Sequence, residues 1–158
     1  MTPFDYIELK VPAKAEYVGV ARLSSSGIAN RMGFNYEDLE DIKVAISEAM
    51  TNAVSHAYAE EEKGEVTIGF GLYEDRLEIM VADRGDSFDL GKVKNGIGPY
   101  DESESIDDLR EGGFGLFLID ALMDKVEINN ELGVVILMTK FLHNNEVGID
   151  DDQISTTQ

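Results

Sequence analysis

The sequence predicts an α+β fold, a two-layer sandwich in which helices cover one mixed, mostly antiparallel sheet. Two observations predict it. Segments of alternating and of helical hydrophobic periodicity follow one another in the order strand, two helices, hairpin, long loop, helix and hairpin. No internal repeat or second domain interrupts this order, and the strands come mostly as hairpins, so a doubly wound parallel sheet is disfavoured.

The N-terminal part is predicted to form a strand followed by a helix. Residues 4–11 alternate between apolar and polar side chains until a proline ends the strand. Residues 17–32 fit a helix that ends near Gly33 and is broken at the polar residues 24–26. Arg22 would lie exposed on this helix. Its apolar positions are Val20, Leu23, Ile28 and Met32.

The stretch 36–58 is the clearest helix, because its apolar residues recur at three- and four-residue spacing. The opposite face carries Glu48 and Asn52. Residues 66–72 and 77–81 then alternate on either side of a short turn and predict an antiparallel hairpin. The apolar positions of the helix are Leu39, Ile42, Ile46, Met50, Ala53 and Ala57.

Residues 84–113 are rich in acids and glycines and follow neither period, which predicts a long loop. Structureless loops of this length inside a compact domain are usually functional or disordered, and we expect this one to act as a lid. Residues 114–123 are apolar on nearly every side, which predicts a buried helix. A second hairpin is predicted from 126–128 and 134–142.

The domain organisation follows from these elements. Residues 1–144 are expected to form a single domain, and residues 145–158 form an acidic tail that is expected to be disordered. A chain of 158 residues is long enough to bury a core without disulfides or a structural metal.

Composition narrows the classes of function. The absence of cysteine excludes disulfides, thiolate catalysis and cysteine-based zinc or iron–sulfur sites. A formal net charge of −19 disfavours direct binding to nucleic acid or to an anionic membrane, and a basic protein surface is the easier partner. No cationic and apolar leader and no membrane-spanning run are found, so a cytoplasmic protein is expected.

The first candidate constellation is E-A-M-T-N-A-V-S-H-A at residues 48–57, which places Glu48 and Asn52 one turn apart on one helical face. In the structural interpretation both residues lie on a solvated face. In the functional interpretation Asn52 offers its carbonyl oxygen to Mg²⁺, and Glu48 acts as a base beside the phosphates. His56 follows in the same segment, and a structural role is favoured for it because metal sites need clustered ligands.

Two further constellations contain glycines. Asp83-Arg84-Gly85 ends a predicted strand and is either an ordinary turn or an adenine site, in which Asp83 accepts a hydrogen bond from the exocyclic amine and Gly85 lets the ring approach. Gly112-Gly113-Phe114-Gly115-Leu116 opens a predicted helix and is either a hinge or a phosphate site formed by backbone N–H groups.

In this order and at these separations the three motifs resemble the N, G1 and G2 boxes of the GHKL ATPase/kinase superfamily, over nearly the whole chain. Within it, the segments D-Y-I-E-L-K-V-P-A, E-Y-V-G-V-A-R-L and F-G-L-Y-E-D-R-L-E-I-M-V-A-D are similar to the bacterial anti-sigma serine kinases. The resemblance implies an ATP lid, the cofactors ATP and Mg²⁺, and a homodimer. It also implies binding of a sigma-B-type sigma factor and serine phosphorylation of an anti-anti-sigma partner.

The resemblance also implies roles for single residues. Glu48 matches the base for the serine hydroxyl and Asn52 matches the Mg²⁺ ligand. The nucleotide-binding positions that it matches are Asp83, Gly85, Gly113, Gly115 and Thr139. Arg22 matches an arginine that contacts the partner. The basic residue that some relatives carry before the phosphate glycines is Glu111 here, with Arg110 one position earlier.

Three other functions remain open from the sequence. A nucleotide-gated anti-sigma binding module would use the same pocket without transferring phosphate, and Glu48 argues against it. A detached catalytic domain of a histidine kinase would need a preceding helix with a phosphoacceptor histidine, and an ATPase motor fragment would need a transducer domain. The destination of the γ-phosphate separates these functions.

Overall fold

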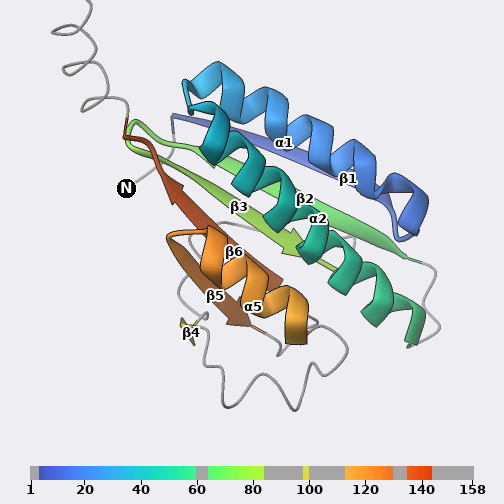
Figure 1. Ribbon diagram of the computed structural model, residues 1–158. Helices are drawn as coiled ribbons and strands as arrows, with labels where there is room; N and C mark the ends of the chain where they lie inside the picture. Colours follow the sequence, from blue (N-terminus) through green and yellow to red (C-terminus); the bar gives the residue numbers. More distant parts are fainter. Residues whose placement is uncertain (1–3, 60–63, 84–97, 100–112, 130–134, 144–158) are drawn as a thin grey trace, which may run out of the picture.

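The computed structural model describes residues 4–59, 64–83, 98–99, 113–129 and 135–143. Its strands are β1 (Asp5–Pro12), β2 (Glu65–Leu72), β3 (Arg76–Ala82), β4 (Gly98–Pro99), β5 (Lys125–Asn129) and β6 (Val135–Phe141). Its helices are a short 3-10 helix η1 (Ala15–Tyr17), α1 (Val18–Met32), α2 (Tyr36–Ala59) and α5 (Gly113–Leu122). The helices form one layer in front of the sheet (Figure 1).

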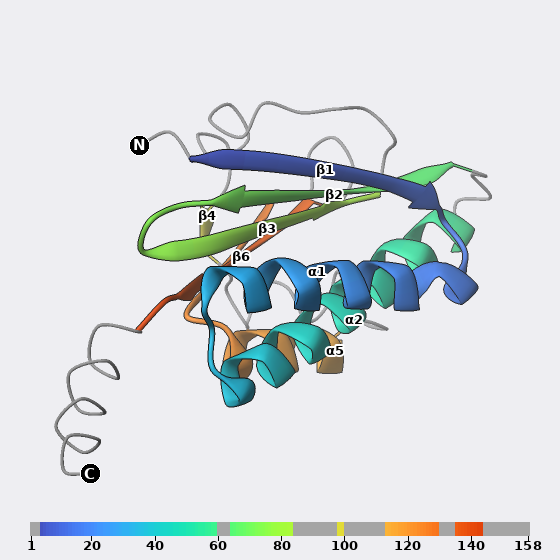
Figure 2. The ribbon, with the colours of Figure 1, turned by 90° about the horizontal axis from the view of Figure 1, so that it is seen from above.

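The strands form one six-stranded sheet in the order β1-β2-β3-β6-β5-β4, and all the described strand pairs are antiparallel. Seen from above, α1, α2 and α5 all lie on the same side of the sheet (Figure 2). The predicted two-layer α+β architecture and both predicted hairpins are therefore confirmed.

Strand alternation divides the sheet into two faces. On β3, Leu77, Ile79 and Val81 belong to the core beneath the helices, and the register pairs Ile79 with Met138 and Val81 with Ile136. The intervening residues of both strands point to the face that carries no helix. This parity decides on which face each polar residue of the sheet lies.

Helix α1 differs from the prediction in two ways. It runs without a break through the serines, because Ser25 is fully buried and its hydroxyl donates to the carbonyl oxygen of Arg22 at 2.9 Å. Val20 and Leu23 are 43% and 69% exposed, since the buried face is instead made of small residues that let the helix approach its neighbours. These residues are Ala21, Ser25 and Ala29.

The ends of α1 and α2 are fixed by local chemistry. Gly33 closes α1 with φ 100°, a left-handed conformation that glycine adopts without strain, and its N–H bonds to the carbonyls of Ala29 and Asn30. Asn35 caps the start of α2, since its side-chain oxygen accepts a hydrogen bond from the N–H of Asp38 at 2.8 Å. The predicted end of α1 is confirmed. The fully buried members of the predicted apolar stripe of α2 are Ile42, Ile46 and Met50.

Helix α5 is less buried than its composition predicts. Leu116 and Ile119 are fully buried, but Phe117 and Leu118 are 41% and 39% exposed. The prediction of a wholly buried helix is therefore wrong. Helix α5 packs against α2 and β5 with one side, and its other side stays exposed. Among the described residues, no helix has both the length and the apolar character needed to cross a bilayer.

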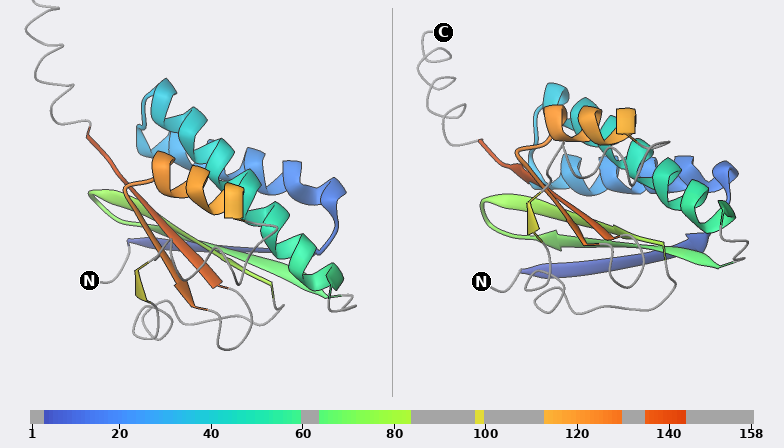
Figure 3. Two further views of the ribbon diagram at one scale, coloured as in Figure 1. Left: turned by 60° about the horizontal axis from the view of Figure 1, so that its bottom comes forward. Right: turned by 90° about the horizontal axis from the view of Figure 1, so that it is seen from below.

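The predicted loop at 84–113 contains a short strand. Gly98 and Pro99 form β4 and pair with Ile128 and Glu127 at one edge of the sheet (Figure 3). A proline is tolerated there because an edge strand leaves one side of its backbone unpaired. The remainder of the predicted lid up to residue 112 and the predicted tail 145–158 lie outside the described residues.

Lys140 connects three elements inside the molecule. Its side chain on β6 is 9% exposed, and its Nζ lies 3.3 Å from Asp41 and 3.8 Å from Asp38, both on α2. The same ammonium group donates to the carbonyl oxygen of Leu122, the last residue of α5. One cation therefore holds α2 and the end of α5 against the sheet.

Lys140→Met is expected to lower the free energy of unfolding by about 1–3 kcal/mol, because the two aspartates and the helix carbonyl lose a charged donor. Urea denaturation followed by circular dichroism measures it, with the exposed Lys14→Met as the matched control. An unchanged midpoint in the Lys140 variant would mean that the contacts add nothing to stability.

Candidate functional site

Helix α2 carries the two polar residues predicted to act on the nucleotide. Glu48 and Asn52 lie one turn apart, both partly exposed. The side-chain nitrogen Nδ2 of Asn52 is buried and has no hydrogen-bond partner among the described residues. Buried polar groups are nearly always paired, so the unpaired Nδ2 donor indicates that an acceptor on a ligand completes its hydrogen bonding.

Helix α5 begins beside Glu48. Gly113 is its first residue and Gly115 its third, and a Cβ atom added to Gly115 would lie 2.9 Å from Oε1 of Glu48. Only a glycine leaves room for the carboxylate in this position, since real Cβ contacts are longer. The first N–H groups of a helix lack intrahelical partners and favour anions. The structure therefore brings Glu48 together with Gly115, one of the predicted phosphate glycines.

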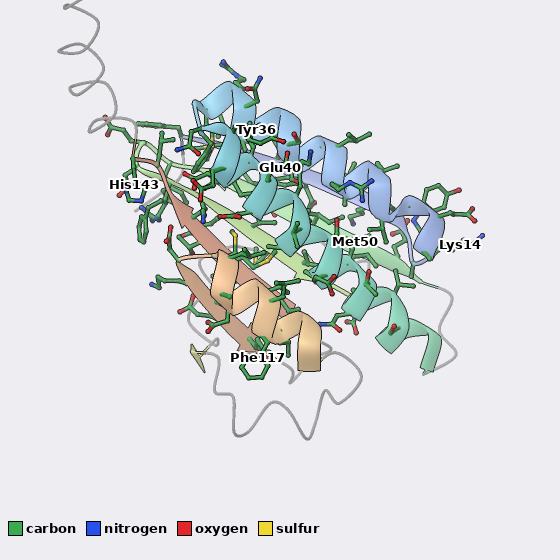
Figure 4. All side chains as sticks on the ribbon, in the orientation of Figure 1. Lys14, Tyr36, Glu40, Met50, Phe117 and His143 are labelled. Atoms are coloured by element: carbon green, nitrogen blue, oxygen red, sulfur yellow. The ribbon has the colours of Figure 1, made fainter. Side chains whose placement is uncertain are left out.

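A pocket of ≈ 560 Å³ opens where α2 and α5 meet. Among the described residues that line it, Glu48 is the one with a charge. Phe117 also lines the pocket, and its ring lies on the side of α5 away from α2 in Figure 4. The apolar residues of the pocket wall were not predicted from the sequence. The lining residues are Glu48, Gly115, Phe117, Leu118 and Ala121. The sequence feature that could have indicated them was the apolar character of α5 on nearly every side.

Asp83 lies directly after β3 and is only 5% exposed. Its position has the same parity as Ile79 and Val81, so it falls on the face of the sheet that the helices cover. A buried carboxylate on this face, at the end of a central strand, is placed where it can accept a hydrogen bond from a ligand held beneath α2.

The structure does not place Thr139 near Asp83. In the register of β3 and β6 it pairs with Glu78, five positions from Asp83, which corresponds to roughly 17 Å along the strands. Its parity also places it on the face opposite to the helices. The threonine is 3% exposed and part of the sheet, and this position does not support its assignment to the same nucleotide site as Asp83.

The other predicted residues are separate from the pocket or outside the description. Arg22 is exposed on α1, as predicted, and does not line the pocket. Gly85 and Arg110 lie outside the described residues, as does the side chain of His56. Of the predicted site residues, the structure describes Glu48, Asn52, Asp83 and the first turn of α5, and it brings Glu48 and Gly115 together.

The shifted pKa values lie away from this site, around the turn between β2 and β3. Burial, followed by the charge of Glu78, raises the pKa of Tyr73 to about 12, although Arg76 opposes the shift. The guanidinium of Arg76 stacks 3.8 Å from the centre of the Tyr73 ring and donates to Glu78 at 2.9 Å. Burial and then Glu8 also raise the pKa of Tyr6 on β1. These groups belong to the hairpin and to the edge strand β1.

Comparison with known proteins agrees with the fold and the motifs. The family model "Histidine kinase-like ATPase domain" matches residues 11–140. A protein of Oceanobacillus iheyensis named serine-protein kinase RsbW is 66% identical over 158 residues, which is the whole of both chains. A protein of the same name from Bacillus subtilis is 55% identical over 146 residues, 92% of this chain and 91% of the relative.

A solved structure shows the same fold. The RsbU and RsbW domains of a Mycobacterium tuberculosis protein match with a TM-score of 0.61 and 22% sequence identity. The match covers 89% of this chain and 33% of that longer chain.

Proposed function

The chain belongs to the RsbW family of serine-protein kinases and has a histidine kinase-like ATPase domain, and on this basis we propose that it is a partner-switching regulator of transcription. As an anti-sigma factor it binds and inhibits a sigma-B-type sigma factor. As an ATP-dependent kinase it phosphorylates a serine of an anti-anti-sigma protein and thereby inactivates that protein. The observation that carries the proposal is the placement of Glu48 against the first turn of α5.

Glu48 acts as the base in the proposed reaction. The serine hydroxyl oxygen forms a bond to the γ-phosphorus of ATP while the bond from that phosphorus to the bridging oxygen breaks, and ADP leaves. The hydroxyl proton passes to the carboxylate of Glu48 and then to solvent. Phosphoryl transfer needs little covalent participation by the protein, so positioning the carboxylate beside the phosphate site is the main requirement.

The nucleotide is held by residues on both layers. Asp83 accepts a hydrogen bond from the adenine amine, which selects adenine over guanine, and Gly85 is proposed to let the ring approach the backbone. The N–H groups of Gly113 and Gly115 bind the phosphates at the start of α5. Thr139 is left out of this site because it lies on the other face of the sheet.

Asn52 fits a magnesium site. The nitrogen Nδ2 of its amide is buried without a hydrogen-bond partner among the described residues. The oxygen of the same amide is the kind of ligand that Mg²⁺ accepts together with phosphate oxygens and water. When bound, Mg²⁺ would neutralise charge on the phosphate oxygens. Asn52 is one turn from Glu48, so the same helix face fixes both groups.

Asn52→Ala is expected to weaken binding of ATP in the presence of Mg²⁺ by about tenfold or more, because the metal ion loses one of its protein ligands. In EDTA the variant and the wild type should bind ATP with similar, weaker affinities, because the amide then has no metal to coordinate. Isothermal titration with and without Mg²⁺ measures both values. Equal affinities in Mg²⁺ would contradict the assignment.

The family of the chain and its net charge indicate the kind of protein that it binds. Arg22, exposed on α1, is proposed to contact the partner proteins. The net charge of −19 favours a basic partner surface and disfavours direct contact with nucleic acid or membranes. We propose a homodimer in the cytoplasm, built from a single kinase domain at 1–144 with an ATP lid near 84–113 and an acidic tail at 145–158.

Incubation with γ-labelled ATP, Mg²⁺ and the anti-anti-sigma protein tests the function. Label stable on a partner serine is expected, together with formation of ADP. Release of the label as inorganic phosphate alone would indicate an ATPase. Tight nucleotide and sigma-factor binding without any transfer would support the nucleotide-gated binding module, which uses the same pocket without chemistry.

A further inference from the structure

Lys140 joins the two helices that carry the candidate site. Its Nζ lies 3.3 Å from the carboxylate of Asp41 on α2 and donates to the carbonyl oxygen of Leu122 at the end of α5. These two contacts form the Lys140 bridge. Helix α2 also carries Glu48, and α5 opens with the turn that contains Gly115. The bridge therefore connects the helix of the proposed base with the helix of the proposed phosphate site.

The two helices meet at two points whose spacing matches. Asp41 and Glu48 are seven residues apart on α2, and Leu122 and Gly115 are seven residues apart on α5. Seven residues make almost two turns, about 10 Å of helix, so both contacts of a helix lie on the same side of it. Helices α2 and α5 lie next to each other and run in opposite directions (Figure 1). The bridge at one end and the contact of Glu48 with Gly115 at the other therefore share one axial register.

The apolar contacts of α5 do not by themselves fix its position along its axis. Leu116 and Ile119 are its residues in the core, and apolar contact has no preferred direction, so packed helices can slide past one another by small amounts. Hydrogen bonds and ion pairs are directional. Those of Lys140 are also little screened by water, since its side chain is 9% exposed. The polar contacts at its C-terminal end are therefore able to fix where α5 lies.

The chain directly after α5 is bound to the same strand as the end of the helix. The N–H of Asp124 donates to the carbonyl oxygen of Thr139 at 2.9 Å, and the carboxylate of Asp124 accepts from the N–H of Phe141 at 2.7 Å. Three consecutive residues of β6 thus hold this end of α5. Lys140, the middle one, also reaches α2 and so relates the position of one helix to that of the other.

We propose that Lys140 is a positioning residue for phosphoryl transfer, an assignment that rests on the proposed kinase function. Its bridge holds α2 and α5 in the register that places the Glu48 carboxylate beside Gly115. The bridge lies about 10 Å along the helices from that contact, so Lys140 acts on the reaction through Glu48 and does not touch the reacting atoms. Without the bridge α5 shifts along α2, and the carboxylate and the phosphate turn lose their alignment.

Lys140→Met in the full-length chain removes the cation and keeps much of the side-chain volume. We expect transfer from bound ATP to the partner serine to slow at least tenfold, because a displacement of about 1 Å can cost two orders of magnitude in a positioned reaction. Single-turnover kinetics at saturating ATP and partner, below the melting temperature of every variant, measures it. Val11→Ala is the control for lowered stability, since it truncates a buried side chain on the edge strand β1 and should leave transfer unchanged.

Asp41→Asn tests the bridge from its other side. It weakens the contact with α2 and leaves the donation from Lys140 to Leu122 in place. Transfer should slow about threefold to tenfold. Glu40→Gln is the matched control, because it makes the same change of charge at the neighbouring position, where the carboxylate pairs with Lys43 at 2.9 Å. This control should transfer phosphate at the wild-type rate.

A third measurement follows the register without any reaction. Because the chain contains no cysteine, Thr51→Cys on α2 and Asp120→Cys on α5 place two spin labels at exposed positions. The distribution of distances between the labels should shift or broaden when Lys140→Met is added. It should stay unchanged when Val11→Ala is added.

The outcomes separate this proposal from the kinase proposal. Transfer by the Lys140→Met variant that is no slower than by the Val11→Ala variant would overturn the positioning role and leave the kinase intact. In the Glu48→Gln background Lys140→Met should cause little further loss, and fully additive losses would overturn the action through Glu48. If the wild type itself transfers no phosphate, the kinase proposal fails, and the labels still test the bridge. Unchanged label distances would overturn the role of Lys140 in the register.

Discussion

Glu48→Gln is expected to lower the rate of phosphoryl transfer to the partner serine by about two to four orders of magnitude, the usual contribution of a general base. Glutamine has nearly the same shape, so the contact with Gly115 and the packing of α5 on α2 are retained. It cannot take the hydroxyl proton. Binding of ATP and of the sigma factor should therefore remain close to wild type.

Single-turnover transfer of labelled phosphate measures this effect separately from binding. Glu40→Gln is the matched control, since Glu40 lies two turns earlier on α2 in a partly exposed ion pair with Lys43 at 2.9 Å. Such pairs contribute little, about 0–1 kcal/mol, and this variant should transfer phosphate normally. Wild-type turnover in the Glu48 variant would remove Glu48 as the base and leave it as a surface carboxylate.

Gly115→Ala is expected to reduce transfer about tenfold to a hundredfold while the protein becomes no less stable. The added Cβ would lie 2.9 Å from Oε1 of Glu48, so the carboxylate must move away from the phosphate site. A displacement of about 1 Å can cost two orders of magnitude in a positioned reaction. Alanine also favours the helix by up to about 1 kcal/mol over glycine, which separates this result from unfolding.

Two comparisons make the glycine experiment specific. Gly27→Ala on α1 is the control, because a Cβ there meets nothing within 4 Å and should leave transfer unchanged. In the Glu48→Gln background, Gly115→Ala should cause little further loss, since both changes act through the same carboxylate. Fully additive losses would indicate that Gly115 acts on the phosphates independently of Glu48.

The fold was predictable because its signals are local. The alternation in β2 and β3 depends on every second residue entering the core, and the structure pairs these strands as the sequence indicated. Gly33 ended α1 through its own backbone conformation. The errors in the predicted elements arose where tertiary contacts determine the structure. Ser25 satisfies its hydroxyl within the helix and is buried against neighbours that periodicity alone cannot identify.

The candidate site was only partly predictable, for a similar reason. Glu48 and Asn52 share a helix face by spacing alone, so their association was evident in the sequence. Thr139 required the register of β6 against β3, which places it on the other face of the sheet. The pocket wall at Phe117 and Leu118 required knowledge of which side of α5 the fold leaves uncovered.

The position of β6 in the sheet has a consequence for biosynthesis. This strand, the last described element along the chain, lies between β3 and β5, so among the described strands it alone joins the two halves of the sheet. Until the ribosome has released β6, β3 keeps an unpaired edge, and such edges invite association with other chains. The nascent polypeptide is therefore exposed to aggregation until nearly all of the domain has been made.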